Sequence, residues 1–565
     1  MPKFNEIKYV RPDFKALNKA IKKGISDLKS AKNYQEFKDV YLALNNRSEE
    51  MMTMAVVASI RNSIDVNDKF YEDENKAISK ASAKMGLLSK KMIKTILDSP
   101  YRKDIDQEFG DNLLKTMEIE LNLISPKIIF DMLKEVKLTR EYSKITATAT
   151  CDFRGEKCNF YGLLKHMQST DRVERKEAFE AWAKMYEDIS LNLDNIYDKL
   201  IKIRLRKAKK LGFDDPIKYF YLNRGRLDYD KEDAKRFKEA VKKEIVPLCQ
   251  ELYDIQAKRL GVDKLHFYDE SLVFPEGNAI PIGNKDELVQ KALKMYEQLS
   301  PQTNEFFHFM VENELFDLET KPGKRMGGYC TFLPAFKAPF IFSNFNGTSA
   351  DVDVLTHEAG HAFEAYLSSR HLPLSEMVFS TSEINEIHSM SMEHFTYPYM
   401  DLFFEDKADK YRYSHLVSSL EVIPYLVSVD EFQQRIYENP GLNAMERRKV
   451  WKDIENEFMP WRDYDGNEFL ENGGFWMQKQ HIFIYPFYYI DYALAQMCAY
   501  QFLIKSEDDK KAAFDQYLDL CKLGGSKGYF ETLEAAHLLN PFKEENVKEI
   551  ALKIKEIVKK FADKL

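Results

Sequence analysis

The stretch "LTHEAGHAF", residues 355 to 363, constrains the fold of this 565-residue chain more than any other segment. Residues on an α-helix advance by about 100° each, so His357 and His361 project from one face, one turn apart. Both imidazoles can then reach one tetrahedral cation. Glu358 points about 100° away from His357, where a carboxylate can border a metal and take a proton from water. The motif therefore predicts a helix with a metal site. The alternative is a structural helix that merely carries two histidines.

Composition narrows the class of protein. The chain is 44% hydrophobic and 31% charged, which is typical of a globular protein with two to four domain-sized units at this length. The net charge of -8 argues against nucleic acid as the main partner. We find no apolar run of about 18 residues and no signal-peptide core, so we expect a cytoplasmic protein without a membrane partner. Nothing in the sequence indicates an oligomeric state.

The six cysteines are scattered and form no C-x-x-C pair. This pattern argues against a zinc ribbon and against a disulfide framework. We therefore expect reduced and mostly buried thiols.

Helical periodicity dominates the chain, with three exceptions that leave room for strands. Residues 1 to about 140 and the long C-terminal part repeat apolar positions at three and four, with Ser169 or Asp171 as a cap where helices resume. Alternating side chains near residues 144–161 predict a hairpin around Arg154 and Gly155. Residues 266–285 indicate a loop with room for one strand.

Residues 325–350 are the most strand-like part of the chain and lead into the histidine helix. Apolar and small polar side chains alternate there, and Gly-Gly and Asn-Gly pairs punctuate the stretch. Ser349 or Asp351 can cap the helix that follows. We therefore predict a mainly α fold with a small sheet beside the HEAGH helix.

A catalytic zinc usually has three protein ligands, and two common spacings for the third are absent. A metzincin needs a histidine six positions past the second one, where this chain has Leu367, and a glycine where it has Glu364. His371 is ten positions past and does not fit. Thermolysin-like spacing requires a glutamate about twenty positions past, where this chain has Thr381.

The next acidic helix, "STSEINEIHSMSMEHF", can supply the third ligand. Glu386 and Glu393 share one face of that helix, whereas His388 points elsewhere. Helix geometry alone leaves Glu383, Glu386 and Glu393 open, and each could equally be a solvated carboxylate.

The segments "GTSADVDVLTHEAGHAF" and "EINEIHSMSMEHF" together resemble the thimet-oligopeptidase and oligoendopeptidase F family of zinc metallopeptidases, in particular its bacterial oligoendopeptidase F and Pz-peptidase branch. The resemblance implies one Zn²⁺ per chain, held by His357, His361 and a glutamate 25 residues further on, which is Glu386. It implies Glu358 as the general base and Glu393 as a supporting acidic residue.

Asp353 lies one helical turn before His357. A carboxylate there could hydrogen-bond the far nitrogen of a ligating imidazole and fix its tautomer. The alternative is an acidic residue that the helix dipole favours near the N-terminus.

The segment "WMQKQHIFIYPFYYIDYALA" resembles the histidine-and-tyrosine segment of the same family, although the family's Gly-Gly-Tyr loop is replaced by "IFIYPF". The resemblance implies that Tyr489, Tyr492 and His481 stabilise the oxyanion or hold the substrate carbonyl. It implies substrate binding by Tyr485 and Tyr488.

We expect a helix whose first turn contains Pro486 and which places Tyr485, Tyr489 and Tyr492 on one face. An aromatic stripe of this kind is also typical of a packed core. The strand "APFIFSNFNGT" corresponds to the family's substrate-binding edge strand, which implies peptide binding by backbone pairing, with Phe342 and Gly328 as substrate-binding residues.

The resemblance implies a zincin-like catalytic lobe and two helical lobes around a deep substrate channel. We place a mostly helical N-terminal lobe at residues 1–205 and the catalytic lobe at residues 206–565. The activity implied is that of a cytoplasmic zinc endopeptidase acting on short peptides. The alternatives are a dipeptidyl carboxypeptidase-type exopeptidase and a non-catalytic peptide-binding protein on this fold, and the latter would need no general base.

Overall fold

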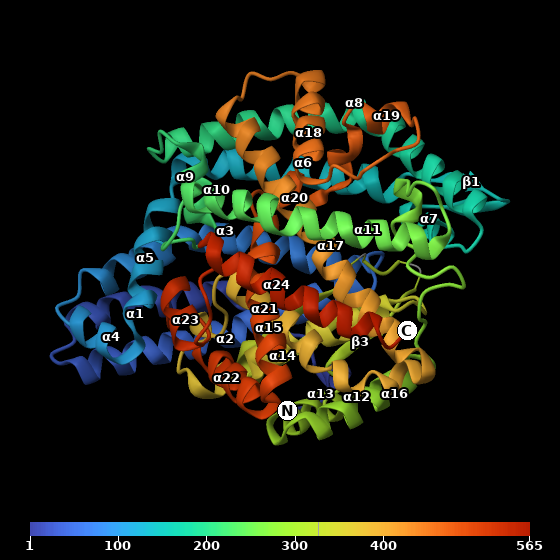
Figure 1. The fold of residues 1–565 in the computed structure, drawn as a ribbon. Helices are drawn as coiled ribbons and strands as arrows, with labels where there is room; N and C mark the ends of the chain where they lie inside the picture. Colours follow the sequence, from blue (N-terminus) through green and yellow to red (C-terminus); the bar gives the residue numbers. More distant parts are fainter. Residues whose placement is uncertain (322, 326) are drawn as a thin grey trace. The chain divides into compact units, whose positions relative to one another are not determined.

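The computed structural model describes residues 1–321, 323–325 and 327–565. Helices make up 73% of the structure (Figure 1), which confirms the mainly α fold. The chain divides into two compact units, each built from three segments. Unit 1 comprises residues 1–126, 280–408 and 498–539, and unit 2 comprises residues 127–279, 409–497 and 540–565. The boundary expected near residues 205 and 206 falls inside one helix, α8 (Arg172–Lys210).

Unit 1 contains the sheet and the histidine helix. Its helices are α1 (Phe14–Ser30), α2 (Tyr34–Ile64), α3 (Lys69–Leu97), α4 (Arg102–Phe109), α5 (Asp111–Leu123), α12 (Lys285–Leu299), α13 (Pro301–Glu312), α14 (Ala350–His371), α15 (Ser382–Phe395), α16 (Asp401–Phe404), α22 (Lys510–Leu523) and α23 (Tyr529–Ala535). Its strands are β3 (Phe316–Glu319), β4 (Tyr329–Leu333) and β5 (Ala338–Phe345).

Unit 2 is helical apart from one short hairpin. Its helices are α6 (Ile129–Thr148), α7 (Phe160–Met167), α8, α9 (Pro216–Asn223), α10 (Lys231–Ala240), α11 (Val246–Leu260), α17 (Ala408–Glu438), α18 (Ala444–Phe458), α19 (Glu468–Glu471), α20 (Gln480–Ile484) and α24 (Glu544–Ala562). The division between the units falls inside α21 (Tyr489–Asp508), after Met497.

The N-terminal helices of unit 1 pack around one apolar cluster. Phe37, Ile96 and Leu114 are almost fully buried in it, and Leu374 and Met377 join them from the segment after α14. Burying each side chain of this kind contributes about 1.5–3 kcal/mol. The successive helices that periodicity predicted for this region are thus present, and they share one apolar core.

The small sheet of unit 1 has the order β3-β5-β4, with β3 parallel and β4 antiparallel to β5. The strand "APFIFSNF" is therefore the middle strand, and the expectation that it is an edge strand is wrong. Its almost entirely buried side chains are typical of a strand with neighbours on both sides. Among the strands of the described residues, β3 and β4 form the edges of this sheet.

The predicted hairpin exists in unit 2 but is shorter than expected. Strands β1 (Cys151–Phe153) and β2 (Glu156–Cys158) flank a turn at Arg154 and Gly155, both of which have positive φ. Residues 144–148 belong to α6 instead. Residues 266–284 form a loop before α12 that holds a 3₁₀ turn, Phe267–Asp269, and none of the described residues there forms a strand.

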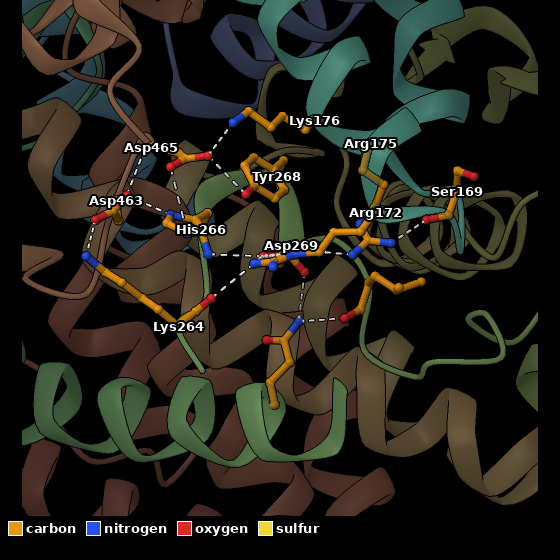
Figure 2. Close-up of polar contacts among 12 residues, drawn as sticks. Ser169, Arg172, Arg175, Lys176, Lys264, His266, Tyr268, Asp269, Asp463 and Asp465 are labelled. Carbon is orange, nitrogen blue, oxygen red and sulfur yellow. Dashed lines mark hydrogen bonds and ion pairs between the residues drawn. The ribbon is translucent and has the colours of Figure 1, made fainter. Parts of the chain in front are cut away.

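That 3₁₀ turn is held by an ion network within unit 2, shown in Figure 2. Asp269 is fully buried and accepts hydrogen bonds from Arg172 and Arg175, each at 2.7 Å, near the start of α8. The backbone N–H of His266 donates to the same carboxylate at 3.2 Å. Nearby, the His266 ring pairs with Asp463 at 2.8 Å. Every charge at the centre of this network has a partner, as a structural ion cluster requires.

Candidate metal and catalytic site

The turn that leads from β5 into α14 is fixed by one carboxylate. Ser349 occupies the N-cap position, but its side chain makes no capping hydrogen bond. Asp351 instead accepts hydrogen bonds from the backbone N–H groups of Asn346 and Gly347, both at 2.8 Å. Of the two predicted caps, Asp351 therefore secures the start of the helix, which then runs through the HEAGH residues.

Gly360, the glycine of the HEAGH run, lets α14 and α15 approach closely. A Cβ atom at this position would lie 2.6 Å from the Cα of Ser389 and 2.7 Å from the carbonyl oxygen of His388. Such distances are shorter than van der Waals contact, so a larger residue would push α15 away. This close approach brings the acidic face of α15 against the two histidines.

Three side chains converge where these helices meet. His357, His361 and Glu386 each offer a ligand atom, and the three atoms lie within 4.8 Å of one another. The Oε2 atom of Glu386 lies 3.3 Å from Nε2 of His357 and 3.4 Å from Nε2 of His361. Ligands that surround a zinc ion tetrahedrally at about 2.0–2.1 Å are about 3.4 Å apart. The spacing and the His₂Glu donor set fit a zinc ion.

The charges of this cluster also fit a bound cation. Burial disfavours the imidazolium form, yet hydrogen bonds to Glu386 and Glu393 outweigh it and raise the pKa of His357 well above its usual value. Burial raises the pKa of Glu386, but the two imidazoles reverse this effect and hold it well below its usual value. The carboxylates thus draw positive charge into the cluster, which a divalent cation would supply.

Glu358 lies beside this cluster and is 7% exposed. Burial raises its pKa, an effect opposed by the two imidazoles. Its Oε2 atom is buried and has no hydrogen-bond partner within the described part of the chain. A raised pKa and an oxygen without a partner are characteristic of a carboxylate placed for proton transfer.

Two further side chains orient the candidate ligands. The Nδ1 atom of His357 pairs with Oε1 of Glu393 at 2.6 Å, on the side of the ring away from Glu386. Ser389 donates a hydrogen bond to Oε2 of Glu386 at 3.0 Å. We expected Asp353 as a possible hydrogen-bond partner of the imidazole nitrogen that faces away from the metal. At His357 this nitrogen is Nδ1, and it pairs with Glu393. The roles of Asp353 and Glu393 in a metal site stay predictions.

Ser389 is a residue of this site that sequence reasoning did not assign. It stands three positions after Glu386, one helical turn away, where a hydroxyl can reach the carboxylate. The motif "EIHSMSME" contained this signal. His388, in contrast, donates a hydrogen bond from Nδ1 to the carbonyl oxygen of Ile384 and is not part of the cluster, as expected.

Gly328 lies close to the candidate base. A Cβ atom there would stand 3.4 Å from Oε1 of Glu358 and 3.2 Å from Val354. Phe342 is fully buried in the middle strand, with its ring stacked on Tyr329 at 4.8 Å. Substrate binding by Gly328 and Phe342 stays a prediction.

The histidine and tyrosines of the second segment gather within unit 2. The ring of His481 lies 4.8 Å from that of Tyr489 and 6.3 Å from that of Tyr492. Tyr488 and Tyr485 are 5.6 and 5.9 Å from the same imidazole. The structure thus brings the four predicted tyrosines of this segment together around the imidazole of His481.

One detail of this segment was predicted wrongly. α21 begins at Tyr489, so Tyr485 and Pro486 precede the helix instead of lying in its first turn. Phe487 has a φ of 61°, a left-handed conformation that a helix does not allow. Its N–H donates to the side chain of Gln433 at 3.0 Å, which holds this break in place. Only Tyr489 and Tyr492 share the predicted helical face.

The sequence was compared with protein families and known proteins. A family described as peptidase family M3 matches residues 165–552, and its N-terminal domain matches residues 4–124. The chain belongs to peptidase family M3. This assignment confirms the family that the two quoted motifs resemble.

Relatives within the M3 family cover most of the chain. The solved structure of Pz peptidase A with an inhibitor superposes with a TM-score of 0.94 at 42% identity, covering 99% of both chains. An oligoendopeptidase F homologue from Borreliella burgdorferi is 24% identical over 89% of this chain and 87% of its own. Oligopeptidase PepF from Bacillus subtilis is 22% identical over 66% of this chain and 55% of its own. These matches identify this member of family M3 as a peptidase.

A membrane span was also sought. Among the helices of the described residues, none combines the length and the apolar character that crossing a bilayer requires.

Proposed function

We propose that this M3 peptidase is a zinc-dependent endopeptidase that cleaves internal bonds of short peptides. One observation carries the proposal: His357, His361 and Glu386 meet at distances that suit tetrahedral zinc ligands, directly beside the buried carboxylate of Glu358. The position of Glu358 supports the proposal, because its carboxylate is buried beside the two imidazoles and has one oxygen unpartnered within the described residues.

When bound, zinc would supply Lewis acidity that polarises the scissile carbonyl and makes a nearby water more acidic. Glu358 takes the proton from the attacking water through the oxygen that has no partner in the described structure. The raised pKa of Glu358 suits two proton transfers. The carboxylate accepts the proton from water, and the resulting carboxylic acid then donates it to the leaving amine.

Glu393 and Ser389 position the ligands. By accepting the Nδ1 proton of His357, Glu393 holds the imidazole in the tautomer that presents Nε2 to a metal. Ser389 fixes the rotamer of Glu386 through a hydrogen bond to the oxygen that faces both imidazoles. These contacts reduce the reorganisation needed when the ion binds.

The substrate peptide would lie in an extended conformation along the sheet of unit 1. Gly328 precedes the edge strand β4 and borders Glu358, so a substrate backbone can approach there without meeting a side chain. In this proposal Tyr489, Tyr492 and His481 donate hydrogen bonds to the oxyanion, as the family resemblance implies, and Tyr485 and Tyr488 contact the peptide.

Peptide cleavage tests the proposal. The protein is incubated with doubly blocked and unblocked peptides of several lengths, with and without a chelator, and the products are identified by mass. Chelator-sensitive internal cuts of doubly blocked peptides are the expected result. Release of terminal dipeptides only, from unblocked peptides, would establish the exopeptidase instead. No cleavage by zinc-loaded protein would favour the peptide-binding alternative.

The third ligand is tested separately by metal content. Glu386→Ala should lose stoichiometric zinc after dialysis against a weak chelator, because two imidazoles alone hold the ion poorly. Glu364→Gln is the matched control, since this fully buried glutamate lies on α14 outside the cluster. Full zinc content in Glu386→Ala would overturn the assignment. The cytoplasmic location and the substrate channel stay predictions.

A further inference from the structure

A second set of metal-type ligands lies in unit 2, where the β1–β2 hairpin meets α7 (Figure 1). Glu156, Cys158 and His166 each offer one ligand atom, and the three atoms lie within 4.8 Å of one another. Glu156 and Cys158 are alternate residues of β2, so their side chains share a face of the hairpin. His166 reaches that face from the last turn of α7. The cluster therefore joins two elements.

The imidazole of this cluster is held in a defined orientation. Nδ1 of His166 pairs with Oε1 of Glu174 at 2.6 Å, and the ring packs against Phe153 at 4.9 Å. The other oxygen of Glu174 accepts a hydrogen bond from Ser169 at 2.8 Å. A carboxylate on one nitrogen is the usual arrangement for a histidine whose other nitrogen, here Nε2, binds a metal.

Burial and charge favour a cation at this place. Cys158 is 5% exposed, whereas Glu156 faces solvent, so an ion can enter past the carboxylate and reach the sulfur. Cys151 stands directly opposite Cys158 in the hairpin register and adds a second sulfur on the same face. The cation in the hairpin turn, Arg154, pairs with Glu177 at 2.8 Å and with Glu174 at 3.6 Å.

We propose that Glu156, Cys158 and His166 bind a divalent transition-metal ion of the zinc class, separate from the ion assigned to the HEAGH helix. Carboxylate, thiolate and imidazole are the donors that zinc accepts, and the thiolate excludes magnesium and calcium as the preferred ions. On binding, the thiol of Cys158 gives its proton to solvent and the sulfur bonds to the metal. The ion fastens the hairpin to α7.

Cobalt(II) chloride distinguishes this site from the other one. Thiolate ligation gives cobalt an intense near-ultraviolet charge-transfer band, and the cluster on α14 and α15 contains no sulfur. The full chain is reduced with a phosphine, its free thiols are counted, and cobalt is added without oxygen. We expect the final intensity of the sulfur-to-cobalt band to correspond to one thiolate-bound cobalt per chain, in addition to the cobalt that the cluster on α14 and α15 takes up. Absence of the band in fully reduced protein would overturn the proposal, whatever the peptidase assay shows.

Substitutions assign the band to the hairpin. Cys158→Ala should abolish it, whereas Cys249→Ala, which removes another buried thiol of unit 2, should leave it intact. Glu174→Gln should weaken cobalt binding about ten- to a hundredfold, because it releases the imidazole. Glu156→Gln is a surface change that cannot disturb a core, and it should also weaken binding. An unchanged band in Cys158→Ala, or unchanged affinity in Glu156→Gln, would overturn the site.

Discussion

Two buried charge clusters of this protein differ in how completely their carboxylates are satisfied. Asp269 in unit 2 is surrounded by Arg172, Arg175 and a backbone N–H group (Figure 2). In unit 1, Glu358 is buried beside two imidazoles with one oxygen unpartnered within the described residues. The burial of both carboxylates is similar, but only the second retains capacity to bind a ligand. The contrast supports the proposed role of Glu358 and a purely structural role of Asp269.

The largest expected effect comes from Glu358→Gln. Removing the base should lower kcat/KM for a peptide by about 10²- to 10⁴-fold while zinc content is unchanged. Because burial raises the pKa of Glu358, its ionised form costs folding free energy at neutral pH, so the metal-free variant should be at least as stable as the parent. Peptide kinetics and urea unfolding of both proteins check this. Glu364→Gln should keep most of the activity, and equal losses in both variants would refute the assignment.

Asp269→Asn should lower the free energy of unfolding, whereas Glu358→Gln should not. The substitution leaves Arg175, which is 3% exposed, without its counter-ion, and this should cost about 3 kcal/mol of unfolding free energy. Zinc content should not change. Urea unfolding measures the loss, with Glu549→Gln as the control because its ion pair with Lys553 is half exposed and contributes about 0.5 kcal/mol or less. Equal stability of the two variants would show that the Asp269 network is not structural.

A smaller effect, on zinc affinity, is expected when the hydroxyl of Ser389 is removed. Ser389→Ala removes the hydrogen bond to Glu386 and should weaken zinc binding about tenfold. Ser391→Ala is the matched control, since this fully buried serine on the same helix has no hydrogen-bond partner for its hydroxyl among the described residues. Competition with a chromophoric chelator measures both affinities, and indistinguishable values would contradict the positioning role.

The smallest effect concerns pH. Burial raises the pKa of Asp269, but hydrogen bonds from Arg172 and Arg175 outweigh it, so the net shift is downward. The pKa of Asp463 is lowered to about 2, where hydrogen bonds, first from Lys264, outweigh burial. A lowered folded-state pKa contributes stability above the unfolded value of about 4 and loses it as the pH falls through the folded value.

Unit 2 should therefore lose stability between about pH 4 and pH 2. In Asp269→Asn this slope should be shallower by at most about 1.4 kcal/mol per pH unit, the equivalent of one proton. Hydrogen exchange along α8 at several pH values checks it. An identical slope in the variant would show that Asp269 does not titrate with unfolding.

The sequence was most informative where periodicity and local spacing determine the geometry. The i, i+4 spacing of His357 and His361 predicted their shared face, and no tertiary contact could change it. The choice among Glu383, Glu386 and Glu393 was not available from helix geometry, because it depends on how α15 crosses α14. That crossing is set by the contact at Gly360, which a one-dimensional pattern does not contain.

The other differences between the sequence predictions and the structure arise from backbone conformation and strand pairing. The apolar run of β5 predicted a strand, but its two neighbours come from separate segments and could not be inferred. The break at Phe487 depends on Gln433, a residue far away in the sequence, so Pro486 alone suggested a longer helix. Ser389 was missed because a serine one turn from a glutamate is common on helices without any special role.

The division of each unit into three segments has a consequence for synthesis on the ribosome. Residues 1–126 cannot complete unit 1 until residues 280–408 and 498–539 have been made. At about 5–20 residues per second, the first segment waits on the order of 20–80 s for its last partner. During that time Phe37, Ile96 and Leu114 lack part of their apolar environment. The nascent chain is therefore a natural client for chaperones that shield exposed hydrophobic surface.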